Sequence, residues 1–285
     1  MKRIVVTGGS GRLGIKVIDE LVTRGFDVLS VDIKRPEKYG CAFLPVDLTN
    51  AAAVQDVLAG SDGVIHLGAI PRPASQPQSV TFQNNVQSTW NVAHSAAVLG
   101  LPRLVFASSV FALGWHESAA EFWPQYVPVD EDHPLTPFEA YGLSKVIGEE
   151  TIAAACRRSK LTAVSLRIMN IIQEDGYSAL PWPIPTKQRP ARFVLWPYID
   201  VRDAAVACCQ ALDAEIQGHE AVYIAAEDIR FDAPVGQLLR EFAPNVAIRT
   251  PLSRLQTVIS IEKARRLLGF RPEFTWRKMR PSENS

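Results

Sequence analysis

The sequence predicts an α/β protein in which helices cover both faces of a doubly wound parallel sheet, with a small C-terminal lobe beside it. Short apolar runs alternate with stretches of helical length through the first half of the chain, a pattern typical of βαβ units. A glycine-rich turn joins the first apolar run to the first helical stretch. The densest apolar stretch, 96–115, carries one charge and has Pro102 and Arg103 near its middle. A strand buried in a parallel sheet explains this stretch better than a helix that spans a bilayer.

The expected strands are short runs rich in Val, Ile, Leu or Phe. In chain order they lie at 3–6, 28–31, 42–45, 64–67, 104–107 and 163–168. The helices between the first five strands are expected at 13–23, 51–58 and 82–99, and a further helix at 141–158 comes before the last strand. Thr49 and Asn50 are both suitable N-caps for the second helix, because a side-chain oxygen of either can accept from a free backbone N–H.

The pattern loosens after about residue 170. The segment 181–190 carries four prolines, so a stiff irregular loop is expected there. Helices return at 201–212, 235–242 and 261–268, with a strand near 221–225. We therefore expect residues 1–170 to form one domain and residues 171–285 to form a small lobe, interleaved with the sheet. Ligands of open parallel sheets bind beyond the carboxyl ends of the strands, so functional residues are expected there.

Composition excludes several classes of function. The chain has 30 Lys and Arg against 30 Asp and Glu, and this balance gives no long-range attraction for nucleic acid or for a membrane surface. Its four cysteines and five histidines lack the spacing of metal ligands, so neither a metal site nor a disulfide framework is expected. Only three apolar residues follow the basic start before Thr7, too few for a signal peptide, and a cytoplasmic protein is expected.

The glycine-rich turn is the first candidate site. It follows the first strand and opens the first helix, the context in which glycines let a backbone approach a pyrophosphate and the helix dipole faces the phosphates. An ordinary glycine-rich turn is the alternative. The expected cofactor-binding residues of this turn are Gly8, Gly9, Ser10, Gly11, Arg12, Leu13 and Gly14.

Asp32 closes the second strand and indicates which dinucleotide would bind. A carboxylate there accepts hydrogen bonds from the adenosine ribose and repels a 2′-phosphate, which favours NAD over NADP. Lys34 and Arg35 follow closely and can neutralise a phosphate, so NADP remains the less favoured alternative. Residues 1–170 are thus expected to be an NAD(P)-binding domain of the Rossmann type.

Tyr141 and Lys145 lie four residues apart on a predicted helix, which places the phenol and the ammonium on one face. A nearby cation favours the phenolate, so the pKa of Tyr141 is expected to fall from about 10 toward neutrality. Ser109, at the end of the fifth strand, is preferred to Ser108 as the hydroxyl that binds the reacting oxygen. Glu149 and Glu150 on the same helix are expected to be solvated charges.

Together these motifs resemble the extended short-chain dehydrogenase/reductase superfamily, and within it the NAD-dependent epimerase/dehydratase family. The resemblance covers most of the chain and implies that Asp47, Leu48, Leu67, Gly68, Ala69 and Asn85 also bind the cofactor. It implies that Tyr141 exchanges a proton with a carbinol or carbonyl and that Lys145 binds the nicotinamide ribose. Ser109 then orients the substrate oxygen. Further matching motifs are Leu166-Arg167-Ile168-Met169-Asn170 and Tyr198-Ile199-Asp200-Val201-Arg202-Asp203.

The substrate is less well indicated. The chain looks most like the compact uronate dehydrogenases, but Val110 and Phe111 replace the polar residues that follow the serine in those enzymes. The short lobe disfavours a bulky nucleotide-sugar. Candidate substrate-binding residues are Ser109, Val110, Arg72, Asn170 and Arg192, with Trp115, His116, Trp182 and Trp196 as weaker ones.

The expected function is NAD-dependent hydride transfer between nicotinamide and a secondary alcohol or ketone of a sugar-like metabolite, with a dehydrogenase slightly preferred. One alternative is a sugar or nucleotide-sugar epimerase or dehydratase that holds NAD tightly. A second is a non-catalytic NAD(P)-binding regulator. The resemblance also implies a homodimer formed through the helices near 82–99 and 141–158.

Overall fold

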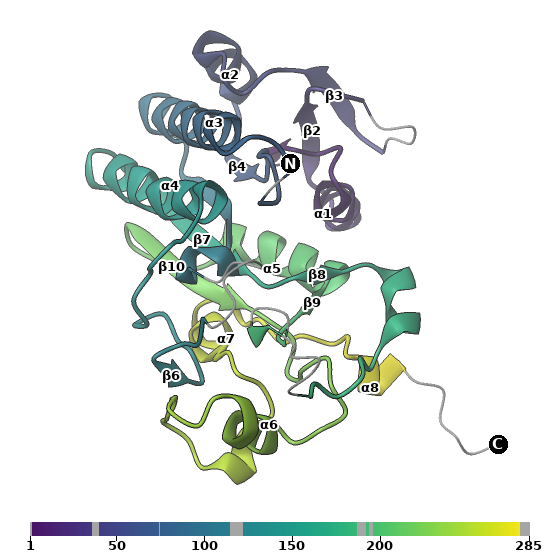
Figure 1. The fold of residues 1–285 in the computed structure, drawn as a ribbon. Helices are drawn as coiled ribbons and strands as arrows, with labels where there is room; N and C mark the ends of the chain where they lie inside the picture. The colour runs from purple at the N-terminus through teal and green to yellow at the C-terminus, as the bar shows by residue number, and fades with distance from the viewer. Residues whose placement is uncertain are drawn as a thin grey trace, which may run out of the picture.

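The centre of the protein is a seven-stranded parallel sheet in the order β10-β7-β5-β4-β1-β2-β3 (Figure 1). The structure is a computed structural model that describes residues 2–35, 40–73, 75–114, 122–186, 192–193 and 196–279. The strands of this sheet are β1 (Arg3–Thr7), β2 (Asp27–Asp32), β3 (Ala42–Pro45), β4 (Gly63–His66), β5 (Arg103–Ser109), β7 (Thr162–Ile168) and β10 (His219–Ile224). The strand order reverses between β1 and β4, as in doubly wound sheets, so the predicted fold class is confirmed.

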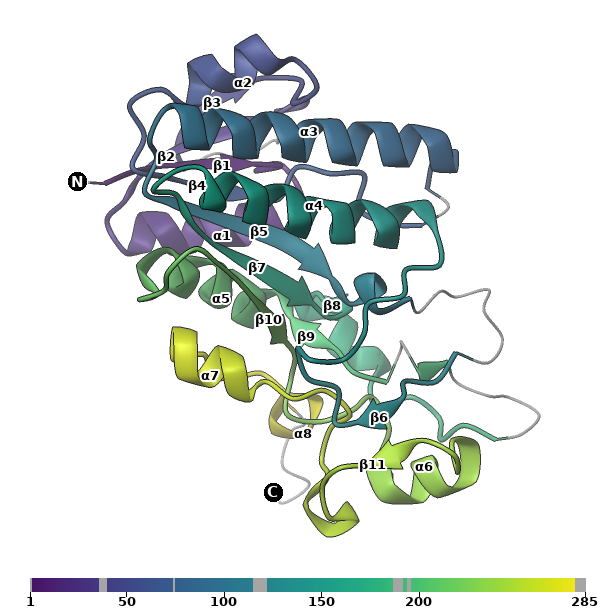
Figure 2. The ribbon, with the colours of Figure 1, turned by 90° about the vertical axis from the view of Figure 1, so that its left-hand side faces the viewer.

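Helices cover both faces of the sheet. One face carries α1 (Arg12–Thr23) and α5 (Val201–Asp213), and the other carries α2 (Ala51–Leu58), α3 (Gln78–Val98) and α4 (Ala140–Arg157), as Figures 1 and 2 show. Alternation along β1 explains the two layers, because Ile4 and Val6 belong to the core under α1 and α5 whereas Val5 belongs to the core under the other helices.

The expected helices lie close to the observed ones, and the largest difference is at the start of α3. This helix begins at Gln78, four residues before the expected start at 82. Pro77 lies just before its first turn, and its carbonyl accepts from the Thr81 N–H at 3.0 Å. Of the two expected N-caps of α2, the structure has Asn50, whose Oδ1 accepts from the Ala53 N–H at 3.2 Å.

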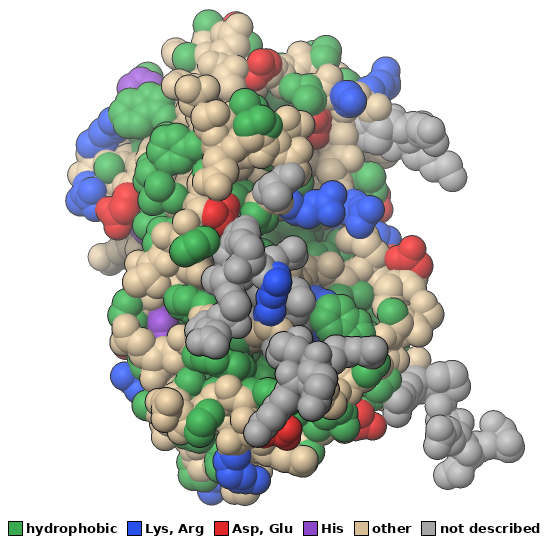
Figure 3. All heavy atoms as spheres, viewed as in Figure 1, with side chains coloured by type: hydrophobic (Ala, Val, Ile, Leu, Met, Phe, Trp, Pro, Cys, Tyr) green, Lys and Arg blue, Asp and Glu red, His purple; other side chains and the backbone are tan. Residues whose placement is uncertain are grey.

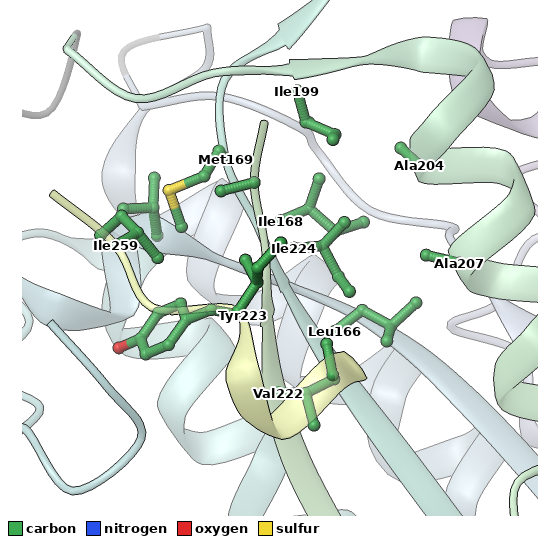
Figure 4. Packing of buried hydrophobic residues seen from close by; sticks show 14 of the residues in the cluster. Leu166, Ile168, Met169, Ile199, Ala204, Ala207, Val222, Tyr223, Ile224 and Ile259 are labelled. Atoms are coloured by element: carbon green, nitrogen blue, oxygen red, sulfur yellow. The ribbon is translucent and has the colours of Figure 1, made fainter. Parts of the chain in front are cut away.

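Strands β10 and β7 pack against helix α5 through buried apolar side chains (Figure 4). Ile224 on β10 and Leu166 on β7 project toward Ala204 and Ala207 of α5, and all four side chains are buried. Tyr223 points to the opposite side, as side-chain alternation along a strand requires. The sheet therefore takes its seventh strand from beyond residue 170.

The rest of the chain forms a lobe beyond the sheet (Figure 2). Two small parallel sheets organise it: β6 (Tyr126–Val127) pairs with β11 (Ala247–Ile248), and β8 (Ile171–Ile172) pairs with β9 (Ile199–Asp200). Its helices are α6 (Val235–Phe242), α7 (Glu262–Leu268) and α8 (Trp276–Met279), and short 3-10 helices lie at Glu174–Ala179 and Leu252–Arg254.

Buried polar contacts fasten the lobe to the sheet region. The Asp203 carboxylate on α5 accepts from the backbone N–H groups of Glu273 and Phe274, both at 3.0 Å. Within the lobe, the hydroxyl of Tyr198 accepts from the Trp276 N–H at 2.9 Å. Among the helices in the described ranges, none is both long enough and apolar enough to cross a membrane.

Candidate active site

The expected site residues gather at the carboxyl ends of the strands. The strands point to the right in Figure 2, so Figures 1 and 3 look onto their carboxyl ends. Thr7, His66 and Ser109 end β1, β4 and β5, which are neighbours in the sheet. Figure 3 shows Lys and Arg side chains near the middle of this face.

The glycine turn after β1 has no room for side chains. Gly8 has φ +70°, and a Cβ placed on it would lie 2.6 Å from the backbone nitrogen of Gly68. A Cβ on Gly9 would lie 2.2 Å from Oγ of Ser30, and one on Gly14 would lie 2.3 Å from the carbonyl oxygen of Gly8. The glycines therefore let the turn, the start of α1 and the loop after β4 approach one another closely.

The first turn of α1 is open to an anion. Gly11 is its N-cap, with no side-chain hydrogen bond at the cap, and the first turn has no acidic residue. The free N–H groups and the positive end of the helix dipole fit the pyrophosphate of a dinucleotide. Gly11 and Arg12 are exposed there, Leu13 is half-buried, and Gly14 is buried.

Asp32 links the end of β2 to the glycine turn. Its Oδ2 accepts from the Ser10 N–H at 3.1 Å, and its Oδ1 accepts from the Ile33 N–H at 2.7 Å. The carboxylate thus lies where the first and second strands end, the position expected for binding an adenosine ribose. Lys34 and Arg35 are exposed beside it.

Asp47 and Leu48 lie on the loop after β3. Asp47 accepts from the backbone and the hydroxyl of Thr49, at 2.9 and 2.7 Å, and these hydrogen bonds lower the pKa of its carboxyl group. A Cβ on Gly68 would lie 2.3 Å from Cδ1 of Leu48, so the Leu48 side chain packs against the loop after β4.

The loop Leu67-Gly68-Ala69 is held by polar side chains from both sides. Oγ1 of Thr7 accepts from the Gly68 N–H at 3.2 Å and is hydrogen-bonded to Nδ1 of His66 at 2.7 Å. The Asn85 amide accepts from the Ile70 N–H at 2.8 Å and donates to the Ile70 carbonyl at 3.2 Å. Asn85 therefore fixes the course of this loop, a role that the sequence motif alone did not specify.

Ser109 and Tyr141 lie together in the structure. Ser109 ends β5 with 6% of its surface exposed, and Tyr141 lies in the first turn of α4 with 8% exposed. Burial raises the pKa of Tyr141 to about 12, although a hydrogen bond with the Ser109 side chain opposes the shift. The expected lowering of this pKa is therefore wrong, because burial outweighs the Ser109 hydrogen bond and the charge of Glu139 adds to the increase.

Lys145 lies one helical turn after Tyr141. Its Nζ donates to the carbonyl of Ala107 at 2.8 Å and lies 5.5 Å from the centre of the Tyr141 ring. Burial lowers the pKa of Lys145 to about 8, and the charge of Glu149 opposes this shift. Ser109, Tyr141 and Lys145 therefore form one buried group at the end of β5.

Glu149 corrects a prediction made from the sequence. It was expected to be solvated, but it is 5% exposed and forms a two-pronged ion pair with Arg167 of β7 at 3.1 and 2.9 Å. Its Oε1 also accepts from Oγ of Ser108 at 2.6 Å. Burial by itself would lower the pKa of Arg167, but the hydrogen bonds and charge of Glu149 raise it above its usual value. Glu150, in contrast, is exposed as expected.

The candidate substrate residues are dispersed. Val110 is buried in the hydrophobic core, so its side chain packs inside the protein. Arg72 and Arg192 are exposed, and Asn170 is half-buried just after β7. Trp182 is half-buried and Trp196 is buried, and both rings pack against Phe231. Trp115 and His116 lie outside the described residues. No group of three or more His, Cys, Asp or Glu in the described ranges is arranged to hold a metal ion.

Known proteins resemble this chain over much of its length. A profile described as the NAD dependent epimerase/dehydratase family matches residues 4–181. Uronate dehydrogenase from Agrobacterium fabrum is 34% identical over 152 residues, covering 52% of this chain and 54% of that protein. UDP-glucose 4-epimerase from Corynebacterium glutamicum is 25% identical over 312 aligned positions, covering 96% of this chain and 92% of that protein. The match to the uronate dehydrogenase thus spans about half of that relative's length.

Solved structures extend the likeness to the lobe. The crystal structure of a short-chain dehydrogenase/reductase superfamily protein from Agrobacterium tumefaciens with bound NAD has a TM-score of 0.74 and 26% identity. That comparison covers 97% of this chain and 94% of the other.

Proposed function

The chain belongs to the NAD-dependent epimerase/dehydratase family, and from this premise we propose that it is an NAD-dependent oxidoreductase acting on a sugar-like metabolite. The observation that carries the proposal is the buried group of Ser109, Tyr141 and Lys145 at the carboxyl edge of the sheet. An intact acid–base group of this kind argues against a non-catalytic regulator.

The residues around the glycine turn fit NAD. Gly8, Gly9 and Gly14 let the turn, the start of α1 and the loop after β4 pack closely together, and the open N-terminus of α1 suits a pyrophosphate. Asp32 suits the ribose hydroxyls of NAD and disfavours the 2′-phosphate of NADP. The remaining residues proposed to line the site are Ser10, Gly11, Arg12, Leu13, Asp47, Leu48, Leu67, Gly68, Ala69 and Asn85.

Each residue of the buried group has a proposed role. Bound NAD supplies the acceptor or donor of a hydride. Tyr141 transfers the proton of the substrate hydroxyl or carbonyl oxygen, and Ser109, already hydrogen-bonded to Tyr141, holds that oxygen in place. Lys145 binds the nicotinamide ribose, and its charge favours the phenolate of Tyr141 while a proton moves.

The substrate class rests on the relatives and on the size of the lobe. Dehydrogenation of a sugar or sugar acid is preferred, with Arg72, Asn170 and Arg192 as candidate contacts. Epimerisation of a sugar is the second candidate, because the epimerase relative aligns along almost the whole chain. The test is to supply NAD with a panel of aldoses, uronates, sugar phosphates and UDP-sugars. Net formation of NADH, read at 340 nm, supports a dehydrogenase, and an isomerised product without net NADH supports an epimerase.

We expect NAD binding to depend on pH because of the lowered pKa of Lys145. Because burial lowers the pKa of Lys145 to about 8, the cation is present below that pH and is lost as the pH rises through it. We expect the affinity for NAD to fall several-fold between pH 7 and 9.5, measured by calorimetry. Lys145→Met should bind NAD more weakly at pH 7 and with no step near pH 8. A step that persists in this variant would assign the titration to another group.

We propose that the protein forms a homodimer through α3 and α4. The two helices lie side by side on one face of the sheet (Figure 2) and expose the apolar side chains Val80, Trp90, Val98 and Leu143. Sedimentation should give a mass of about 63 kDa, twice the 31.4 kDa of the chain. Trp90→Glu combined with Leu143→Glu should give monomers, and Val22→Glu, at an exposed position on α1, is the control that should remain dimeric. Equal masses for all three proteins would contradict this interface.

We also propose a cytoplasmic location. Cys41, Cys156, Cys208 and Cys209 are all free thiols, in keeping with a reducing compartment.

A further inference from the structure

Arg230 is a buried cation in the C-terminal lobe. It lies six residues after the end of β10 and is 7% exposed. Its backbone is fixed on both sides, since its N–H donates to the Trp196 carbonyl at 3.1 Å and its carbonyl accepts from the Trp182 N–H at 2.8 Å. The direction of its side chain is therefore set by the fold.

Among the residues that the structure describes, the guanidinium of Arg230 has aromatic neighbours and no anionic one. Its central carbon lies 4.6 Å from the centre of the Trp182 ring and 6.0 Å from that of Tyr198. Among the described residues, none accepts a hydrogen bond from the guanidinium or forms an ion pair with it, and Nε is sealed from solvent without a partner. Burial lowers the pKa of Arg230 to about 10, with only the Tyr198 hydroxyl opposing the shift.

Three other arginines of this half of the chain have acidic partners. Arg202 pairs with Asp200, Arg265 with Glu227, and Arg277 with Asp232. Asp228 and Asp232, each two residues from Arg230 in sequence, lie 3.8 and 2.8 Å from Arg277 instead. Arg230 is thus buried more deeply than these arginines and is unpaired in the described parts of the chain.

A buried cation without a partner is unfavourable, because it has lost its water and gained no anion in exchange. Aromatic faces offset only part of that loss. The N–H donors of a guanidinium lie in its plane and suit a planar, two-pronged partner such as a carboxylate or phosphoryl group.

The position of Arg230 places it near the expected substrate side of the protein. It follows the carboxyl end of β10, which lies at the same edge of the sheet as Ser109 at the end of β5. Trp182 comes from the loop after β8, and Tyr198 directly precedes β9. These segments belong to the lobe that extends beyond that edge (Figure 2).

We propose that Arg230 binds an oxyanion of the substrate, a carboxylate or a phosphoryl group, in a subsite of the C-terminal lobe. This inference rests on the proposed function in that the bound molecule is taken to be the sugar-like substrate. It narrows the substrate class to anionic sugars, such as sugar acids and sugar phosphates, and separates them from neutral sugars.

The test compares the binding of anionic and neutral sugars to the wild type and to Arg230→Met. Calorimetry with D-glucuronate and D-glucose 6-phosphate distinguishes the two anion sources, D-glucose is the neutral ligand, and NAD is titrated separately. We expect at least one anionic sugar to bind the wild type and to bind Arg230→Met at least tenfold more weakly, with NAD affinity unchanged. Arg240→Met, at an exposed position on α6, should behave as the wild type. The subsite is overturned if the wild type and Arg230→Met bind the anionic sugars with equal affinity, or if the wild type binds none of them. A wild type that does not bind NAD contradicts the proposed function instead.

Thermal unfolding without ligand separates binding from a structural role. If Arg230 is kept for a ligand, removing the unpaired cation leaves the Tm of Arg230→Met equal to or above that of the wild type. Arg230→Lys keeps the charge but loses the planar fork, and it should bind the anion with intermediate affinity. A lower Tm together with unchanged anion affinity would mean that Arg230 only braces Trp182 and Tyr198, and would overturn the proposal.

Discussion

Replacing Tyr141 with Phe is expected to lower kcat by about 10²- to 10⁴-fold, the range that a positioned acid or base contributes. Only the hydroxyl is lost, since a Phe ring keeps the edge-on packing against Phe111, whose ring centre lies 5.8 Å away. The measurement is steady-state kinetics on the substrate that the panel identifies, with NAD affinity measured in parallel and expected to be unchanged.

Tyr126→Phe is the matched control for this variant. Tyr126 is also buried and its hydroxyl donates to Asp130 at 2.6 Å, but it lies in β6 of the lobe. We expect its kcat to stay within about twofold of the wild type. Full turnover by Tyr141→Phe would remove Tyr141 from the catalytic role, whatever the control shows.

Replacing Glu149 with Ala is expected to lower the free energy of unfolding by about 3–5 kcal/mol, because Arg167 is left as a buried cation without its partner. Ser108 also loses the carboxylate that accepts its hydrogen bond. The measurement is unfolding in urea, with the midpoint and slope compared between variants.

Two further variants distinguish this ion pair from an ordinary surface charge. Glu150→Ala, at the exposed neighbouring position, should change stability by less than about 0.5 kcal/mol. Glu149→Leu combined with Arg167→Met replaces both charges with apolar groups and should recover much of the stability lost in Glu149→Ala. A Glu149→Ala variant as stable as the wild type would mean that the pair contributes nothing net.

The sequence predicted the fold because local patterns decide it. Apolar runs of strand length, the glycine turn and the Asn50 cap are readable from neighbouring residues, and the strands and α2 lie close to where these patterns placed them. The spacing of Tyr141 and Lys145 is equally local, since residues four apart on a helix share a face.

What the sequence did not predict depends on distant neighbours. Glu149 was expected to be solvated because acidic residues usually are, and its partner Arg167 comes from another element, 18 residues further on. The pKa of Tyr141 was expected to fall because Lys145 is four residues away in the sequence, whereas the burial that raises this pKa comes from residues that only the fold brings together. Arg230 lacks an anionic partner in the described part of the chain, and only the folded structure shows which side chains reach it.

The pairing of β6 with β11 has a consequence for engineering. These two strands lie about 120 residues apart in the chain and pair in the lobe. Trp182 and Phe231 also meet in the lobe, through an isolated β-bridge. The lobe is therefore built from separate segments of the chain, and the strands of the large sheet lie between these segments in the sequence. A chimera in which a relative supplies all residues after 200 would pair the relative's β11 with the β6 of this chain. Transplanting specificity between members of this family should require at least three matched crossovers, and single-crossover chimeras should express poorly.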